Sequence, residues 1–312
     1  MPWVIGISAF VLFNIIVLII FSWRNAKASV KPKCLTLEKE EEYNRKRGLW
    51  LDFDSYDRTP YEIKGKNGYI LHAEFVDCES VRGNGRYMIL CHGHTSNRYG
   101  SIKYLNCYIK LGFSCIIYDA RTHGENAPDK CTLGAVEAED LLCVINDTRS
   151  RYSDINVLGL HGESMGSSTS LIVTKYSPKI DFIVADCGFT SVYDVIHGCY
   201  SNIHLAFLTP FVFIAAKILY GIDLKETTAL SDVSGNKYPI LFIHGSGDTF
   251  IPCSHSEKLC KAASSNGAYT ELILVEGAGH ANCRKVAGFD TYTGYISRFL
   301  DNIGYGYKEN EA

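Results

Sequence analysis

A serine lies between two glycines in "LGLHGESMGS", residues 158–167, where an apolar run gives way to small polar residues. The run before Ser164, "INVLGLH", predicts a strand, and "MGSSTSLIVTKYS" after it predicts a helix. A turn this sharp requires Gly162 and Gly166, because a side chain at either position would meet neighbouring backbone. The turn also aims the free amides of the helix N-terminus at a reacting carbonyl. The segment therefore predicts a nucleophile elbow with Ser164 as the nucleophile.

A serine hydroxyl is a weak nucleophile unless a base activates it and an acid holds that base. "HGSGDTFIP" places Asp248 just after an apolar run ending at His244, and "VEGAGHA" places His280 just after the last such run. The chain order Ser164, Asp248, His280 is that of an elbow completed by two later strand ends. His280 would then take the serine proton, while Asp248 fixes the imidazole tautomer. Asp186, at the end of the preceding run, is the alternative acid.

Acyl transfer also needs backbone amides that stabilise the developing oxyanion. "CHGHTSN" ends the first buried run in a loop that can face the serine turn. We therefore expect the N–H groups of His94 and Met165 to form the oxyanion hole. A metal site built from His92, His94 and His123 is the alternative, but no carboxylate–histidine spacing supports it, and we predict no metal.

Six short apolar runs alternate with amphipathic stretches from residue 85 onward, and each run ends in a Gly, His or Asp cluster. This alternation predicts a parallel sheet covered by helices on both faces, with the chemistry at the carboxyl ends of its strands. A hairpin around Asn67-Gly68 precedes the runs. The runs cover residues 87–93, 113–120, 155–162, 180–188, 238–245 and 270–280.

These motifs together resemble the α/β-hydrolase superfamily, specifically its bacterial branch of serine aminopeptidase-like and monoacylglycerol-lipase-like hydrolases. The resemblance covers about residues 60–300 and is carried, in order, by "HGHTSN", "YDARTHGEN", "HGESMGS", "ADCGFTS", "HGSGDTFIP" and "EGAGH". It implies an α/β fold with an eight-stranded, mostly parallel sheet, Ser-Asp-His catalysis and no cofactor. One departure is Thr122, which stands where glycine is common in the family.

The segment between residues 188 and 234 departs from the strand rhythm and predicts a small helical cap over the serine. It contains "SNIHLAFLTPFVFIAAKILYGIDL", which Pro210 and Lys217 interrupt and which is too short to span a membrane. Its large apolar side chains could line an acyl pocket, or they could simply pack the cap onto the core. They are Phe207, Phe211, Phe213, Ile214 and Leu219.

The N-terminus, residues 1–28, predicts a membrane anchor. No charged residue occurs from Trp3 to Phe21, which is long enough for a helix to cross a bilayer. Trp3 and Trp23 bracket the run, and the basic residues that follow it favour a single pass through the cell membrane with the body on the cytoplasmic side. These are Arg24, Lys27, Lys31 and Lys33. A cleaved signal peptide ending at Ala28 is the alternative, although the basic n-region is missing.

Residues 29–58 form a charged connector, and residues 59–312 form the hydrolase domain. With 46% hydrophobic residues and a net charge of −3, the chain can bury a full core and has no basic face for nucleic acid. Its twelve cysteines are scattered without a C-x-x-C pair, which favours free thiols in a reducing compartment.

The sequence therefore predicts a membrane-anchored serine hydrolase that cleaves carboxylic esters, including lipid-derived acyl esters, through an acyl-enzyme. The same triad could serve a peptidase or a thioesterase, because it acts on any activated acyl group. A protein of another class also remains: a membrane-anchored interaction protein that keeps the hydrolase scaffold without the activity. The intact set of Ser164, Asp248 and His280 argues against this last alternative.

Overall fold

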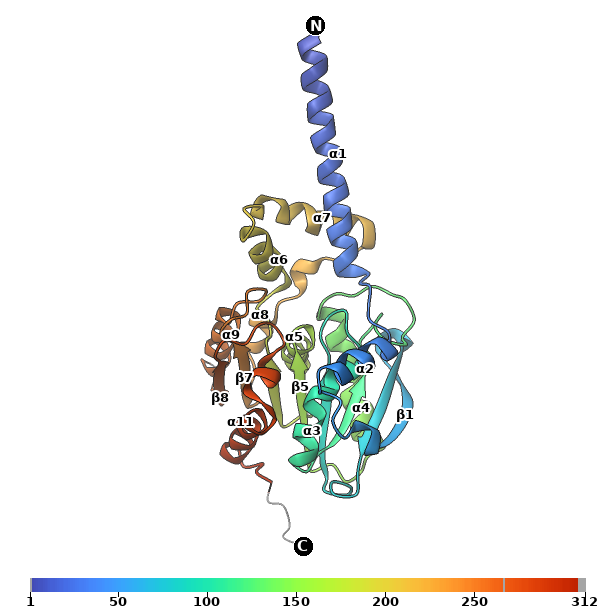
Figure 1. Ribbon diagram of the computed structural model, residues 1–312, viewed down its shortest axis with the longest axis vertical. Coiled ribbons are helices and arrows are strands. Elements are labelled where there is room, and N and C mark those ends of the chain that lie inside the picture. Colours follow the sequence, from blue (N-terminus) through green and yellow to red (C-terminus); the bar gives the residue numbers. More distant parts are fainter. Residues whose placement is uncertain (1, 266, 308–312) are drawn as a thin grey trace.

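A computed structural model describes residues 2–265 and 267–307 and is built around one eight-stranded sheet. The strands follow the order β1-β2-β4-β3-β5-β6-β7-β8 across the sheet, and Figure 1 shows β1 and β8 at its two sides. All six apolar runs of the sequence form strands of this sheet. The strands are β1 (Asp57–Lys64), β2 (Ile70–Asp77), β3 (Arg86–Cys91), β4 (Ser114–Tyr118), β5 (Val157–Glu163), β6 (Phe182–Asp186), β7 (Ile240–Gly245) and β8 (Thr270–Val275).

The sheet is mixed rather than purely parallel. β2 pairs antiparallel with both β1 and β4, and every pair from β4 through β8 is parallel. The hairpin turns at Asn67, whose φ of 56° lies in the left-handed region. The predicted α/β fold, with a mostly parallel sheet and an N-terminal hairpin, is confirmed. Because β3 to β8 run in one direction, their carboxyl ends share one edge.

Helices cover both faces of the sheet and bury a separate apolar core on each. One face packs against α4 (Ala135–Arg151), α5 (Met165–Ile172), α8 (Ala229–Val233) and α9 (Ser254–Ser264). The other face packs against α3 (Ile102–Lys110), α10 (Cys283–Ala287) and α11 (Phe289–Asn302). The central strands β4, β5 and β6 are buried along their whole length, which explains why their sequences are apolar on both faces.

The predicted cap lies over the carboxyl edge of the sheet. It consists of α6 (Val192–Ser201) and α7 (Thr209–Tyr220), with the short turns η5 (Ala206–Leu208) and η6 (Leu224–Glu226). Pro210 stands in the first turn of α7, where its missing N–H costs no hydrogen bond. Val192, Val212 and Phe213 are buried in the cluster that joins the two helices.

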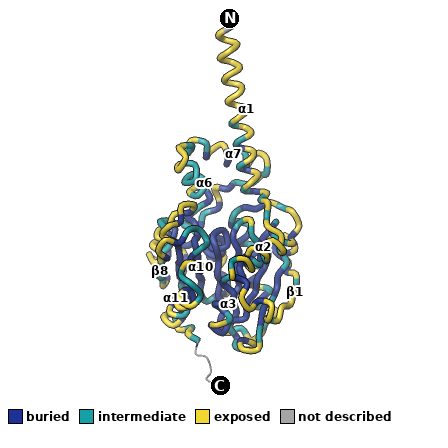
Figure 2. The backbone as a smooth tube through the Cα atoms, viewed as in Figure 1, coloured by how far each residue is buried: buried dark blue, intermediate teal, exposed yellow. Residues whose placement is uncertain are grey.

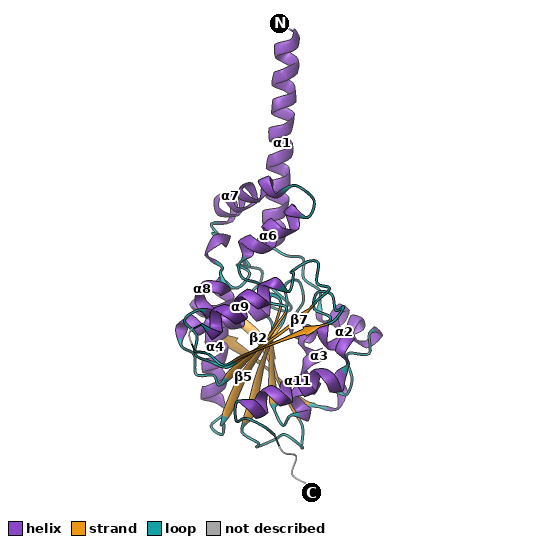
Figure 3. Cartoon of the chain, turned by 90° about the vertical axis from the view of Figure 1, so that its left-hand side faces the viewer, coloured by secondary structure: helices purple, strands orange, loops and turns teal. Residues whose placement is uncertain are grey.

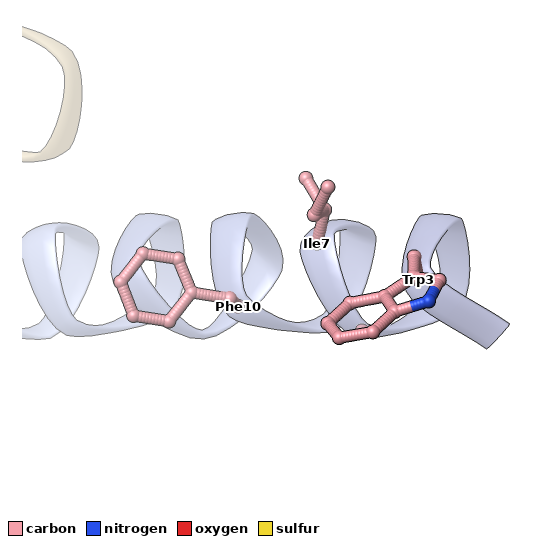
Figure 4. A pocket seen from close by; sticks show the side chains of 4 residues that line it. Trp3, Ile7 and Phe10 are labelled. Atoms are coloured by element: carbon pink, nitrogen blue, oxygen red, sulfur yellow. The ribbon is translucent and has the colours of Figure 1, made fainter.

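The N-terminal helix α1 (Pro2–Val30) projects from the body past the cap (Figures 1 and 3). Its outer part is exposed (Figure 2). Figure 4 shows the side chains of Trp3, Ile7 and Phe10 on the outer end of the helix. By length and composition α1 could cross a membrane, as an anchor or a signal sequence could. Its last turns behave differently: Ala26 and Val30 are fully buried against the cap. The helix therefore extends beyond the predicted boundary at residue 28 and belongs partly to the folded body.

The segment expected to be a connector is also fixed to the body. It contains α2 (Leu37–Lys46), whose N-cap Thr36 accepts a hydrogen bond from the N–H of Lys39. Just before this helix, Leu35 N–H donates to Thr95 O at 2.9 Å, and Asn97 Nδ2 donates to Leu35 O at 3.0 Å. These bonds hold the segment against the loop that follows β3. The sequence alone did not indicate this docking.

All twelve cysteines are free thiols. Six of them are buried, including Cys91 and Cys115 inside strands of the sheet. Burial raises the pKa of Cys91 to about 11, so this thiol stays protonated at neutral pH. The cysteines inside the sheet therefore act as small apolar residues.

Candidate active site

Ser164 lies on the sharp turn between β5 and α5, with φ 53° and ψ −113°. A Cβ on Gly162 would lie 2.2 Å from Gly166 O, and a Cβ on Gly166 would lie 2.1 Å from Cys91 O. Backbone occupies both places, so neither position tolerates a side chain. The nucleophile elbow predicted from "HGESMG" is confirmed as a local structure.

Two loops at the carboxyl edge bring a histidine and an aspartate to this serine. His280, in the loop after β8, has its Nε2 3.0 Å from Ser164 Oγ and its Nδ1 2.7 Å from Asp248 Oδ2. Asp248 lies in the loop after β7. With Nδ1 protonated and donating to Asp248, Nε2 is left as the acceptor for the serine proton. The structure thus joins the three predicted residues in one hydrogen-bonded chain.

Asp248 is held as a carboxylate by several donors. Its Oδ1 accepts the N–H groups of Phe250 and Ile251 at 3.0 and 2.9 Å. Burial alone would raise the pKa of Asp248, but hydrogen bonds from His244 and His280, together with the Ile251 N–H, outweigh it and hold the pKa well below its usual range. The carboxylate is therefore ionised at neutral pH and can support a positive charge on His280.

His244 is the neighbour whose role the sequence did not reveal. Its Nε2 lies 3.3 Å from Asp248 Oδ2 and 2.8 Å from Ile251 O, and its Nδ1 lies 2.7 Å from Ser256 Oγ. From the sequence we placed His244 only at the end of an apolar run, and the contact shows that it touches the predicted acid. The spacing His-x-x-x-Asp at the end of an apolar run is the pattern that could have indicated this.

Asp186, the alternative acid, is fully buried beneath the elbow. Its Oδ2 accepts the hydroxyl of Tyr292 at 2.7 Å, and its backbone O accepts the N–H of Ser164 at 2.9 Å. Burial raises the pKa of Asp186, and the charge of Glu163 raises it further. Since the Nδ1 of His280 is already bonded to Asp248, the geometry favours Asp248 as the acid.

The two predicted oxyanion donors lie beside the nucleophile. His94 and Met165 line the same cavity as Ser164. The loop carrying His94 passes close to the elbow, because a Cβ on Gly93 would lie 3.6 Å from the Cβ of Ser164. Within the described residues, neither the His94 N–H nor the Met165 N–H donates a hydrogen bond to the protein. Both amides are therefore free for a substrate oxygen.

Two of the three histidines of the alternative metal site, His92 and His123, have both ring nitrogens bonded to the backbone. His92 Nδ1 lies 2.8 Å from Gly93 O, and its Nε2 accepts the N–H of Ala120 at 2.9 Å. His123 is bonded in the same way, to Arg121 O and to the Thr95 N–H. The ligand atoms of His94, His123 and Cys131 do lie within 4.8 Å of one another. His123 nevertheless has no free lone pair for a cation in this arrangement.

Ser164 opens onto an apolar cavity of about 440 Å³ beneath the cap. The cap lines it through α6 rather than α7. Apart from the catalytic set, it is lined by Ser29, Thr95, Leu133, Phe189, Val192, Val195, Ile196, Phe250 and Ile251. Ser29 comes from the last turn of α1, so the N-terminal helix contributes to the wall.

The structure therefore corrects the prediction that large apolar side chains of α7, and of the turn before it, line the acyl pocket. Phe213 is buried between the cap helices, whereas Phe207, Phe211 and Leu219 are 66, 40 and 52% exposed. None of the four lines the cavity over Ser164. The periodicity of an apolar helix shows that it has an apolar face, but the packing of α7 on α1 decides which way that face points.

A second cavity, of about 390 Å³, also borders His280, and most of the side chains that line it are polar. Its wall includes Glu40 from α2 and Arg47 directly after that helix, together with Lys103 and Glu163, which form an ion pair. Arg47 donates to Asn282 Oδ1 at 2.7 Å, which ties α2 to the loop after His280. His280 thus borders both cavities.

A nucleophile elbow at the carboxyl edge of this sheet, with a histidine and an aspartate from later loops, defines a serine hydrolase of the α/β-hydrolase superfamily. The comparison with known families agrees. The model of the prolyl oligopeptidase family matches residues 129–302, more than half of the chain, and the protein belongs to this family.

Known relatives and solved structures extend over most of the chain. The uncharacterized protein YqkD of Bacillus subtilis (strain 168) is 28% identical over 269 residues, covering 82% of this chain and 83% of YqkD. The Pyrococcus furiosus esterase Pf2001 matches with a TM-score of 0.64 and 22% identity, covering 81% of this chain and 96% of the esterase. Pyrococcus horikoshii acylaminoacyl peptidase matches with a TM-score of 0.62 and 15% identity, covering 86% of this chain and 44% of the peptidase. At these identities the two structural likenesses establish the fold alone.

Proposed function

We propose that the protein hydrolyses carboxylic esters of apolar acyl groups, including lipid-derived ones, through an acyl-enzyme on Ser164. The observation that carries the proposal is the hydrogen-bonded chain from Ser164 through His280 to Asp248, which opens onto an apolar cavity. A cavity of about 440 Å³ lies within the usual range for small-molecule sites. Its apolar lining favours an acyl chain over a charged peptide segment.

In the proposed reaction, Ser164 Oγ attacks the ester carbonyl as His280 Nε2 takes the hydroxyl proton. The carbonyl oxygen becomes an oxyanion that the N–H groups of His94 and Met165 stabilise. The tetrahedral intermediate expels the alkoxide, which takes the proton from His280 and leaves as an alcohol. Water then attacks the acyl-enzyme with His280 again acting as the base, and this step releases the acid and restores Ser164.

The polar cavity beside His280 supports a polar alcohol as the leaving group. Glu40, Lys103 and Glu163 offer hydrogen-bonding groups there, and His280 itself borders both cavities. A substrate with an apolar acyl part and a hydroxylated alcohol part matches the apolar and the polar cavity, respectively. This arrangement supports an ester of a polyol more than a simple alkyl ester.

Labelling with a fluorophosphonate probe tests the serine chemistry. Wild-type protein should be labelled once, and Ser164→Ala should lose the label while keeping its fold, because the change removes a single small group. Ser167→Ala, a change one turn further along α5, is the control and should still be labelled. Labelling that persists in Ser164→Ala would assign the nucleophile elsewhere. A protein that no probe labels would instead be the non-catalytic interaction protein.

A peptidase is the second candidate, because the family is described as the prolyl oligopeptidase family and one structural neighbour is an acylaminoacyl peptidase. Turnover of p-nitrophenyl esters of increasing chain length, beside aminoacyl p-nitroanilides and acyl thioesters, separates the substrates. We expect the esters to be hydrolysed fastest, with kcat/KM rising with chain length until the cavity is full. Faster turnover of the anilides would make the protein a peptidase.

We also propose that α1 anchors the protein in the cell membrane with the catalytic body on the cytoplasmic side. The exposed apolar length of the helix and the basic residues after Trp23 support this orientation. The protein should stay in the membrane fraction after a carbonate wash, and protease added to intact cells should leave the body uncut. A mature protein in the medium that starts at Ser29 would show a signal peptide. Cleavage of the body in intact cells would show the opposite topology.

A further inference from the structure

The outward face of α7 is apolar and exposed. Ile214, Ile218 and Leu219 are 52, 75 and 52% exposed, and Phe211 is 40% exposed. Phe207 and Ile203, just before this helix, are exposed as well. A soluble protein rarely leaves so many large apolar side chains together in water, so this face has a partner. Neither cavity beside His280 involves any of these residues.

This face is continuous with the surface of α1. Side chains of the two helices together line an apolar hollow of about 360 Å³. From α1 come Leu18, Ile19, Ser22 and Trp23, and from α7 come Phe211, Ile214, Ala215, Ile218 and Leu219. Phe21 on α1 also lies 5.5 Å, between ring centroids, from Tyr200 at the end of α6. The two helices thus present one apolar surface, and Figure 1 shows α7 beside the base of α1.

The length of α1 determines where a bilayer would lie. Its free part runs from Trp3 to about Ile20, and from Leu18 onward every third or fourth residue turns toward the cap. Eighteen residues at 1.5 Å each span about 27 Å. A bilayer has a hydrocarbon core of about 30 Å, so the free part of α1 is needed in full to cross it. The near surface of the bilayer must therefore lie at the level of Leu18 to Trp23, where α7 packs.

The charged residues near this level agree with a headgroup layer. Lys27 Nζ lies 5.3 Å from the ring of Trp23, and Lys31 Nζ lies 5.8 Å from the ring of Tyr220, at the end of α7. Lysines and aromatic rings with this arrangement are typical of the membrane interface. The apolar face of α7 and these two lysines come from different parts of the chain, yet they lie side by side at the end of α7, where Lys31 contacts Tyr220.

Building on the proposed anchor, we propose that α7 lies in the interfacial layer of the bilayer that α1 spans, with Phe211, Ile214 and Ile218 among the lipids. The cap then stands on the membrane, and the acyl cavity over Ser164 opens beneath it. α6, which lines this cavity with Val192, Val195 and Ile196, packs directly on α7. Acyl substrates would therefore reach the serine from the membrane surface rather than from solution.

The test uses full-length protein in phosphatidylcholine nanodiscs. We compare turnover of a long-chain acyl ester embedded in the disc with turnover of water-soluble p-nitrophenyl butyrate. Ile218→Glu should reduce the ratio of the two activities by about 10-fold or more, because a charge at this depth opposes insertion, and it should leave butyrate turnover unchanged. Val286→Glu is the matched control: Val286 is 52% exposed, compared with 75% for Ile218, but it lies on α10 of the body, so its activity ratio should equal that of wild type.

A second measurement places α7 without using the activity. Ile218→Trp and Val286→Trp are each reconstituted with lipids brominated on their acyl chains. The added tryptophan at residue 218 should be quenched well beyond the wild-type background, and the one at residue 286 should not be. Equal quenching at the two sites, or an unchanged activity ratio in Ile218→Glu, would overturn the inference. If wild-type protein hydrolysed neither the embedded ester nor p-nitrophenyl butyrate, that result would instead contradict the proposed function.

Discussion

His244 Nε2 lies 3.3 Å from Asp248 Oδ2, the same oxygen that accepts the hydrogen bond of His280 Nδ1 at 2.7 Å. His244 is fully buried and does not reach the serine, so it acts as a positioning residue for the acid. A hydrogen bond to a charged group contributes about 1.5–3 kcal/mol. We therefore expect His244→Ala to lower kcat by roughly 10- to 100-fold with little change in KM.

Two further readouts separate positioning from simple structural damage in that variant. His244→Gln keeps a side-chain N–H donor and should recover part of kcat. The melting temperature of His244→Ala, measured beside kcat, is the second readout, because a positioning role predicts a fall in kcat that exceeds any loss of folded protein. A loss of kcat that only matches the loss of folded protein, with no recovery in His244→Gln, would contradict the positioning role.

The two candidate acids should differ strongly when each is changed to the amide. Asp248→Asn should lose on the order of 10⁴-fold in kcat, because an amide holds His280 in the wrong tautomer. Asp186→Asn should cost little, since burial already favours the neutral form of this side chain and asparagine is also neutral. Steady-state kinetics of the two variants on one p-nitrophenyl ester provide the ranking. The reverse ranking would assign the role of the acid to Asp186, at the end of β6, instead of Asp248, after β7.

Two helical glycines provide a matched test of the elbow. A Cβ on Gly166 would lie 2.1 Å from Cys91 O, whereas a Cβ on Gly198 in α6 would meet nothing within 4 Å. Gly166→Ala should therefore abolish the activity and lower the melting temperature, because backbone has to move. Gly198→Ala should keep the activity and raise stability by up to about 1 kcal/mol, as expected for glycine to alanine inside a helix. Thermal unfolding and probe labelling of both variants check the contrast.

Truncations of α1 should show how far the helix belongs to the body. Removal of residues 1–20 leaves the buried turns that contain Ala26 and Val30. Removal of residues 1–28 takes away Phe21 and Ala26 and uncovers the apolar cluster of the cap. The shorter deletion should keep the melting temperature of the body, and the longer one should lower it by several degrees. Equal melting temperatures would mean that the cap does not depend on α1.

Buried histidines should make the protein sensitive to acid. Burial lowers the pKa of His92 and of His161 to about 3, so both stay neutral in the folded chain. The unfolded chain takes up these protons below about pH 6.5, so stability falls as the pH decreases from that value toward 3. Each histidine contributes up to about 1.4 kcal/mol per pH unit.

A single substitution isolates one of these protons. His161 Nδ1 lies 2.8 Å from the hydroxyl of Tyr108, a contact that glutamine can also make. His161→Gln should therefore reduce the slope of unfolding free energy against pH, between pH 4 and 6, by about one proton. Denaturant unfolding across this pH range measures the slope. A slope equal to that of wild type would show that His161 is protonated in the folded state.

The sequence alone determined the local features of this protein. The strand runs, the hairpin at Asn67 and the elbow at Ser164 follow from short-range rules: apolar residues for buried strands, glycines where backbone comes within about 2 Å. The order Ser164, Asp248, His280 could also be predicted, because parallel strands bring their carboxyl ends to one edge wherever they lie in the chain.

Only the tertiary structure decided which partners these features meet. Asp186 and Asp248 both follow apolar strands, and the choice between them depends on which loop reaches His280. The apolar face of α7 was evident from its residues, but the packing of α1 turned that face outward and left the acyl cavity to α6. Likewise, α2 and the last turn of α1 became walls of the site through contacts such as Leu35 with Thr95, between residues about sixty apart. Such contacts depend on how whole elements pack, and no local pattern encodes them.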